Sequence, residues 1–201
     1  MDIGALFKAA WAKFTEHAAP LVLATIVTMA APNIVSYVLG KIPGVGGFLG
    51  MIVGGTLSIF LGMGLTSMAL DVVDGKSPEL PQLFETFKAR QVDYLVTGVL
   101  VASGAILCGV GAIVTSFLFL LAPVMVIDGR GWNEALRASY EAVTEDFGTH
   151  ALLWLVCVGL VMVGAMTFGI GALVTVPLSL LVLTSFYRER TAPRVIEAEV
   201  G

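Results

Sequence analysis

The sequence predicts an all-α fold, a polytopic transmembrane helical bundle of six spans. Three observations predict it: the composition, four long uncharged apolar stretches, and the confinement of charge to the segments between them. The 201 residues are 57% hydrophobic and 13% charged, with a mean hydropathy of +0.93. Soluble globular proteins are typically about 45–50% apolar and about 25% charged. A chain with so little charge has too little polar surface to stay in water.

The apolar stretches give the six predicted helices. A helix needs about 20 apolar residues to cross a hydrocarbon core of about 30 Å. Residues 18–40 and 46–70 each suit one span, whereas residues 94–127 and 151–187 are too long for one and are divided by glycines. Glycine adopts the left-handed backbone that a tight reversal needs. The predicted hairpin turns contain Gly44, Gly46, Gly109, Gly111, Gly169 and Gly171.

The two halves of residues 94–127 are the weakest of the predicted spans. Each has about 17 residues, the lower limit for crossing a bilayer. They either cross with local thinning of the membrane or form wedges that do not fully cross.

The charges predict the orientation. Every Lys and Arg except Lys41 falls in the N-terminal segment, residues 71–93, residues 128–150 or the C-terminal tail, and all Asp and Glu lie there too. With six spans these segments share one side, which the positive-inside rule makes cytoplasmic. We therefore expect a multi-pass protein of the bacterial inner membrane with both termini in the cytoplasm. Its interleaved charges, with a net charge of -4, make nucleic acid an unexpected partner.

An internal repeat organises the chain. Residues 109–115 (GVGAIVT) recur as residues 169–175 (GIGALVT), and Gly44-Val45-Gly46 is a weaker copy. Residues 3–14 and 132–143 each carry an apolar stripe at helical spacing, with Ser139 as its weak member, and residues 80–87 carry a shorter one. We expect a single domain over residues 1–190, with repeats at about 1–75, 76–130 and 131–190, and a tail at 191–201. The aromatic anchors expected at the membrane interface are Phe7, Trp11, Phe84, Trp132 and Tyr140.

The second predicted span carries small residues at every fourth position. They are Gly46, Gly50, Gly54, Ser58, Gly62 and Thr66. Small residues let helix backbones approach closely and gain contacts that lipid does not provide. This stripe predicts either packing inside the bundle, against the first span, or an interface between copies of the chain in a homo-oligomer.

The sequence offers no catalytic constellation. No Asp, Glu, Lys, Arg or His lies within the predicted spans, although ion-coupled transporters usually place an ionisable group there. His17 and His150 lie at the predicted interface, where we expect helix-end anchors rather than pH sensors. Cys108 and Cys157 lie in apolar stretches and are expected to be small hydrophobic residues. We therefore predict neither an enzyme nor a cofactor or metal site, with the lipid bilayer as the main partner.

Residues 122–128 (APVMVID), with residues 134–139 and Phe147, resemble a group of bacterial integral membrane proteins. The group includes the YciC-like proteins and the membrane domain fused to some glycerophosphodiester phosphodiesterases. The similarity covers mainly residues 80–190 and extends through Pro177 to Tyr187-Arg188. It implies a six-helix inner-membrane protein and transfers no catalytic residue.

The function expected from these features is a non-catalytic membrane scaffold that self-associates. Two alternatives remain open at this point. One is a transporter or channel for an uncharged or lipid-like substrate. The other is membrane bending by interfacial helices and wedge-like hairpins.

Overall fold

The computed structural model is helical throughout its regular structure, within the described residues 3–85, 91–103, 110–167 and 169–200. The all-α prediction is therefore confirmed. The helices are α1 (Ile3–Glu16), α2 (Ala18–Gly40), α3 (Gly46–Val73), α4 (Gln82–Glu85), α5 (Gln91–Ser103), α6 (Val110–Leu118), α7 (Ala122–Ile127), α8 (Trp132–Glu145), α9 (Phe147–Met166) and α10 (Ala172–Val200).

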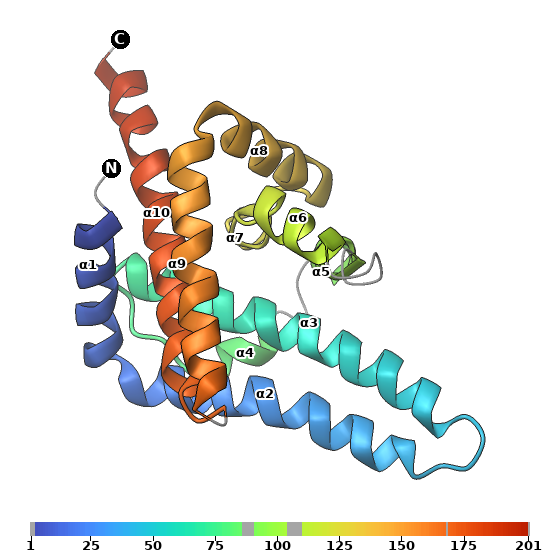
Figure 1. The fold of residues 1–201 in the computed structure, drawn as a ribbon. Helices are drawn as coiled ribbons and strands as arrows, with labels where there is room; N and C mark the ends of the chain where they lie inside the picture. Colours follow the sequence, from blue (N-terminus) through green and yellow to red (C-terminus); the bar gives the residue numbers. More distant parts are fainter. Residues whose placement is uncertain (1–2, 86–90, 104–109, 168, 201) are drawn as a thin grey trace.

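Four of these helices are long and apolar enough to cross a membrane. They are α2, α3, α9 and the part of α10 from Ala172 to Thr191. They form two hairpins, α2–α3 and α9–α10, and the first lies across the second rather than alongside it (Figure 1). This arrangement supports a membrane protein.

The α2–α3 hairpin projects from the rest of the molecule (Figure 1). Its turn uses Gly44, whose φ of 82° is the left-handed conformation expected of a turn glycine. Large apolar side chains near the turn are exposed, including Tyr37, Phe48 and Met51. In water such a surface would be a liability, whereas in lipid it costs nothing.

The amphipathic helix α1 packs against α10. Its buried residues Ile3, Leu6, Ala10 and Phe14 follow the helical spacing seen in the sequence. At its end, Lys13 Nζ donates to the carbonyl oxygen of Val73 over 3.0 Å, which ties α1 to the end of α3.

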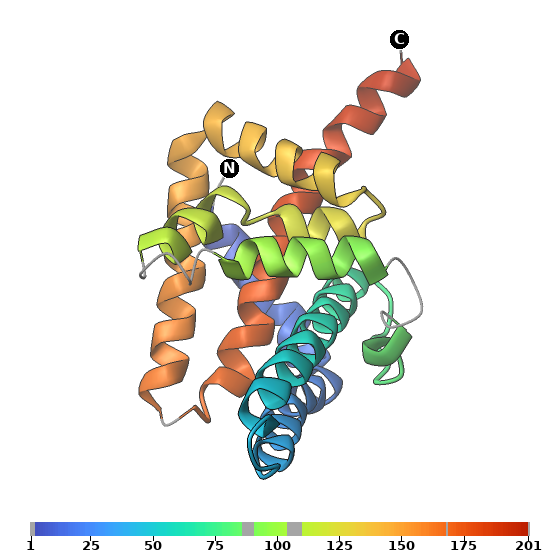
Figure 2. The ribbon, with the colours of Figure 1, turned by 90° about the vertical axis from the view of Figure 1, so that its right-hand side faces the viewer.

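The second half of the middle segment differs from the single helix of about 17 residues that the sequence predicts. It contains α6, which ends at Leu118, and α7, whose six residues at about 1.5 Å each are too few to cross a hydrocarbon core of about 30 Å. In the first half, α5 begins at Gln91 and is described as far as Ser103. Pro123 lies in the first turn of α7 and has no N–H to continue the α6 ladder, so the second helix is interrupted at 119–121. Figure 2 shows these green and yellow-green helices lying across the orange and red α9–α10 pair.

Ser139 of α8 supplies hydrogen-bond partners for the backbone groups at this interruption. Its hydroxyl donates to the carbonyl oxygen of Leu118 over 3.0 Å and accepts from the backbone N–H of Leu121 over 3.3 Å. A helix end inside an apolar environment otherwise leaves backbone groups without partners. The polar residue that weakens the apolar stripe of α8 is thus fully buried because it completes the backbone of another element.

The main core lies where the inner half of α3 meets α10. Fully buried side chains there include Leu61, Leu65 and Met68 of α3 and Leu181 and Phe186 of α10. The helix α3 also contacts α4, α5 and α7, so it connects the projecting hairpin to α10 and to the middle segment.

The small-residue stripe on α3 does not face a single partner. A Cβ on Gly46, Gly50 or Gly54 would collide with Leu39 or Ser36 of α2, so these three glycines permit the close α2–α3 approach. Ser58, by contrast, is exposed, and a Cβ on Gly62 meets nothing within 4 Å. Each step of four residues advances about 40° around a helix of 3.6 residues per turn, so a period-four stripe winds away from its first partner. Packing against the first span is therefore what the structure shows for the first half of the stripe.

Replacing Gly50 by Ala should destabilise the hairpin, because the new Cβ would lie 2.7 Å from the carbonyl oxygen of Ser36. We expect a loss of about 1–3 kcal/mol, typical of overpacking. Gly55→Ala is the matched control, since its Cβ meets nothing within 4 Å, and it should leave stability unchanged or slightly raised. Thermal unfolding in mild detergent, followed by circular dichroism, compares the two, and equal midpoints would contradict the packing argument.

Candidate functional site

The side chains of Asp74, Asp128, Asp146, Arg188 and Arg190 gather in ion pairs at one end of the molecule, the charged end. Two helix ends there have the same backbone geometry. The helix α3 ends at Asp74-Gly75 and α7 ends at Asp128-Gly129, and the two glycines have φ of 78° and 107°. In both, the residue after the glycine donates its N–H five residues back, Lys76 to Asp71 O over 2.8 Å and Arg130 to Met125 O over 3.0 Å. This is the Schellman ending, in which glycine takes the left-handed position.

Arg188 of α10 bridges these two ends. Its guanidinium makes a bidentate contact with Asp74, with Nε to Oδ1 at 2.8 Å and Nη2 to Oδ2 at 2.7 Å. Its Nη1 lies 2.8 Å from Oδ1 of Asp128. Tyr187 Oη donates to the other oxygen of Asp128 over 2.6 Å. We call Asp74, Asp128, Tyr187 and Arg188 the arginine bridge.

The arginine bridge is partly screened from solvent. About a quarter to a third of each charged side chain is exposed: 31% for Arg188, 27% for Asp74 and 26% for Asp128. The planar guanidinium presents its donors in a fixed fork that suits two carboxylates at once. The bridge therefore fixes the ends of α3 and α7 against α10.

A second polar cluster joins α8, α9 and α10. Asp146 ends α8 and caps α9, where its carboxylate accepts from the N–H of Thr149 over 3.2 Å. His150 Nδ1 lies 2.8 Å from the carbonyl oxygen of Asp146, and its Nε2 lies 3.2 Å from Nη1 of Arg190. An arginine can only donate, so Nε2 accepts and Nδ1 carries the proton. His150 is thus a neutral, fully buried anchor between two helices.

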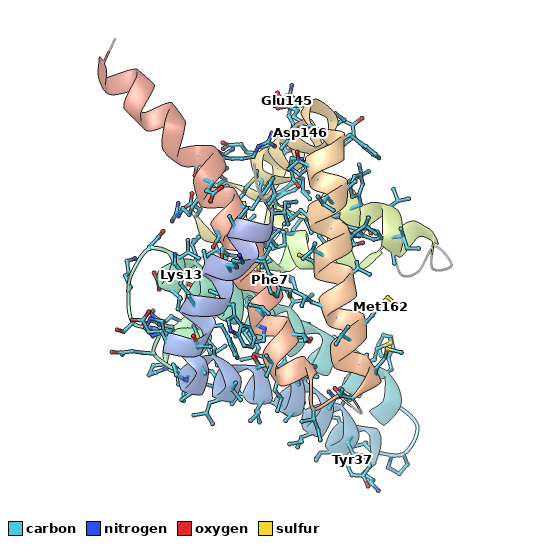
Figure 3. All side chains as sticks on the ribbon, turned by 60° about the vertical axis from the view of Figure 1, so that its left-hand side comes forward. Phe7, Lys13, Tyr37, Glu145, Asp146 and Met162 are labelled. Atoms are coloured by element: carbon cyan, nitrogen blue, oxygen red, sulfur yellow. The ribbon has the colours of Figure 1, made fainter. Side chains whose placement is uncertain are left out.

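Asp146 is ionised more readily than an ordinary carboxyl group. Hydrogen bonds from Thr149 lower its pKa, and the nearby positive charge of Arg190 lowers the pKa further. Figure 3 shows Asp146 beside Glu145 at one end of the molecule, with Tyr37 at the other end on the α2–α3 hairpin.

Two cavities open at the charged end. The larger, of about 380 Å³, lies between α7, α8 and α10. The smaller, of about 290 Å³, lies between α1, α10 and the end of α3, with Lys13 and Arg188 in its lining. The larger cavity falls within the size range of small-ligand sites, which is about 300–1,000 Å³.

The predicted site residues are spread over the fold. Gly44 and Gly169 lie in turns with φ of 82° each, Gly46 and Gly111 lie within α3 and α6, and Gly109 lies outside the described residues. Gly171 N donates to Thr167 Oγ1 over 2.8 Å in the α9–α10 turn. Among the expected interfacial anchors, Phe7 is half-buried, and the exposed ones are Trp11, Phe84, Trp132 and Tyr140.

The arginine bridge was not predicted from the sequence, although a signal for it exists. Asp74-Gly75-Lys76 and Asp128-Gly129-Arg130 are the same three-residue pattern. The glycine motifs at 109–111 and 169–171 are 60 residues apart in the sequence. Asp128 and Arg188 are also 60 residues apart, so they occupy corresponding positions of the repeat. Opposite charges at corresponding positions of the repeat predict a contact once the helices are paired.

Within the described residues, no group of three or more His, Cys, Asp or Glu side chains is placed to hold a metal ion. The carboxylates of the arginine bridge are occupied by arginine and tyrosine donors.

The chain is similar to proteins of two mycobacteria. It is 28% identical over 156 residues to an uncharacterized protein of Mycobacterium tuberculosis and to one of Mycobacterium bovis. The alignment covers 75% of this chain and 47% of each relative, so the chain spans about half the length of these relatives. No protein-family model and no solved structure matches the chain.

Arg188→Gln should loosen the attachment of α3 and α7 to α10. The change leaves two partly buried carboxylates without a cationic partner, and we expect a loss of about 1–3 kcal/mol, below the range for a fully buried pair. Arg137→Gln is the control, because Arg137 is 80% exposed in its pair with Glu141 and should contribute less than about 1 kcal/mol. Thermal unfolding in detergent tests both, and similar midpoints would show that the bridge contributes no more than a surface pair.

The Asp146 cap should give stability that is lost in acid. A carboxyl with a lowered pKa in the folded protein stabilises it above the unfolded pKa, near 4, and this contribution disappears as pH falls through the folded pKa. Asp146→Ala should therefore lower the unfolding midpoint at neutral pH, and the gap to the wild type should close below about pH 4. A gap that stays constant from neutral to acid pH would contradict an ionised cap.

Proposed function

We propose that this protein is a non-catalytic integral membrane protein that self-associates and organises its surroundings in the bacterial inner membrane. One observation carries the proposal, the projecting α2–α3 hairpin, whose outer face is apolar, rich in small residues and uncovered by the rest of the chain. Helices in lipid associate through such faces, because close backbone approach gains contacts that lipid chains do not supply.

The outer face of α3 is distinct from the face that packs on α2. Met51 is 65% exposed, Gly47, Gly55 and Ser58 are exposed, and a Cβ on Gly47, Gly55 or Gly62 meets nothing within 4 Å. At 100° per residue these positions fall within an arc of about 80°, whose centre lies about 60° from Gly54 and about 100° from Gly50. A second copy could approach this side without disturbing the hairpin.

The charged end faces the cytoplasm in this proposal. Two hairpins make four spans, an even number that puts both termini on one side, and the positive-inside rule makes that side the cytoplasm. The helices α5, α6 and α7 form a wedge that enters the membrane without crossing it, which preserves the even number of spans. The repeat organisation draws support from the matched Schellman endings at Asp74 and Asp128. The resemblance to YciC-like proteins is part of this proposal and brings no activity with it.

The transport alternative draws on three buried hydroxyl groups. Thr97, Thr175 and Ser185 have no hydrogen-bond partner among the described residues. A substrate path would need them to line one continuous cavity. Ser185 lines the smaller cavity at the charged end, and neither Thr97 nor Thr175 lines that cavity or the larger one, so these two cavities do not join the three hydroxyl groups into one path.

Gly55→Leu tests self-association directly. The new side chain enters open space in one copy, so the fold should persist, while the contact between copies should be blocked. We expect a discrete oligomer for the wild type and a shift to monomer for the variant, measured as particle mass in nanodiscs.

Gly159→Leu on α9 is the matched control, because its Cβ also meets nothing within 4 Å and it lies on the other hairpin. This variant should keep the wild-type mass. A monomeric wild type, or an unchanged mass in both Gly55→Leu and Ser58→Leu, would remove this interface.

A further inference from the structure

The larger cavity at the charged end has a lining of mixed polarity. Its apolar part comes from α7 and α8 and comprises Leu121, Met125, Ala138 and Ala142. Its polar part contains charges of both signs. These are Arg130 and Arg190 on the basic side and Glu141 and Glu145 on the acidic side, with Tyr187 and Thr191 between the helices.

From this arrangement we propose that the cavity binds the headgroup of a phospholipid that carries both a phosphate and a primary ammonium group, as phosphatidylethanolamine does. The proposal rests on the membrane placement supported by the four apolar helices. It does not require self-association, and it adds a lipid site to the scaffold.

The two arginines have donors to spare. Arg130 approaches Glu134 only to 3.9 Å, beyond hydrogen-bond distance. Arg190 donates from Nη1 to His150 Nε2 over 3.2 Å, and its contacts with Ala142 O and Asp146 Oδ2 are at 3.5 Å, the outer limit of a hydrogen bond. Each guanidinium has five N–H donors, so both can add a phosphate oxygen. Arg188 differs, because its donors are engaged at 2.7–2.8 Å in the arginine bridge.

The glutamates argue against a simple anion. Glu145 is exposed and makes no ion pair among the described residues, and Glu141 is paired with Arg137, which lies outside the cavity lining. Carboxylates that face the cavity repel a bare phosphate and accept hydrogen bonds from an ammonium group. A zwitterion satisfies both halves of the lining at once.

The position of the cavity fits a lipid rather than a water-soluble ligand. It lies where α7 and α10 reach the charged end, and Tyr187, whose hydroxyl contacts Asp128, lines it. The apolar side chains that α7 contributes to its lining, Leu121 and Met125, are buried. Occupancy would join α7, α8 and α10 at the point where the arginine bridge already joins α7 and α10.

Native mass spectrometry of the full chain in mild detergent tests the proposal. The protein is offered equal amounts of phosphatidylethanolamine, phosphatidylglycerol and phosphatidylcholine, and we expect one phosphatidylethanolamine to be retained in preference. Phosphatidylcholine lacks N–H donors and phosphatidylglycerol lacks the cation, so both should bind less. Arg130→Gln should reduce the retained lipid about tenfold, the worth of one hydrogen bond to a charged group.

Glu145→Gln should reduce the preference for phosphatidylethanolamine over phosphatidylcholine, and Arg137→Gln is the control that should retain the wild-type lipid. Equal retention of the three lipids would overturn the proposal, as would equal effects of Arg130→Gln and Arg137→Gln. Release of the lipid by excess inorganic phosphate would assign the cavity to free phosphate and overturn the lipid source. A monomeric protein that still retains phosphatidylethanolamine would support this site while refuting self-association.

Discussion

The arrangement of the helices depends on one guanidinium group. Arg188 contacts carboxylates at the ends of α3 and α7 and is itself part of α10, so three elements from different thirds of the chain meet at one side chain. The contact is needed most by α7, whose six residues are too few to hold a fixed position alone. Since α3 continues into the projecting hairpin, the same contact also orients the surface proposed for self-association.

Sequence patterns predicted the long helices well, because a span of twenty apolar residues has few alternatives in lipid. The two hairpins, the turn glycines Gly44 and Gly169, and the buried stripe of α1 follow from composition and spacing alone. The middle segment was harder, because its break depends on Pro123 together with Ser139, which is 16 residues away in the sequence. No local pattern reveals that a distant serine will satisfy an interrupted backbone.

The candidate site, too, could be predicted from the sequence only where it depends on neighbouring residues. The Schellman endings could be read from Asp-Gly pairs, whereas their joint partner Arg188 required knowledge of which helices meet. The small-residue stripe shows that a correct periodicity need not define a single contact surface. Gly46 and Gly54 serve the hairpin itself, and the winding of the helix leaves Gly55 and Ser58 for other contacts.

The serine of α8 that completes the α6–α7 break also constrains the order in which the chain can mature. A ribosome delivers residues 119–121 to the membrane before Ser139 has been made, so at that moment the carbonyl of Leu118 and the amide of Leu121 lack their native partner. Exposed backbone groups are costly in hydrocarbon. In the proposed wedge, the middle segment therefore waits near the bilayer surface and reaches its final depth only after α8 has emerged and docked, so its insertion lags behind its synthesis.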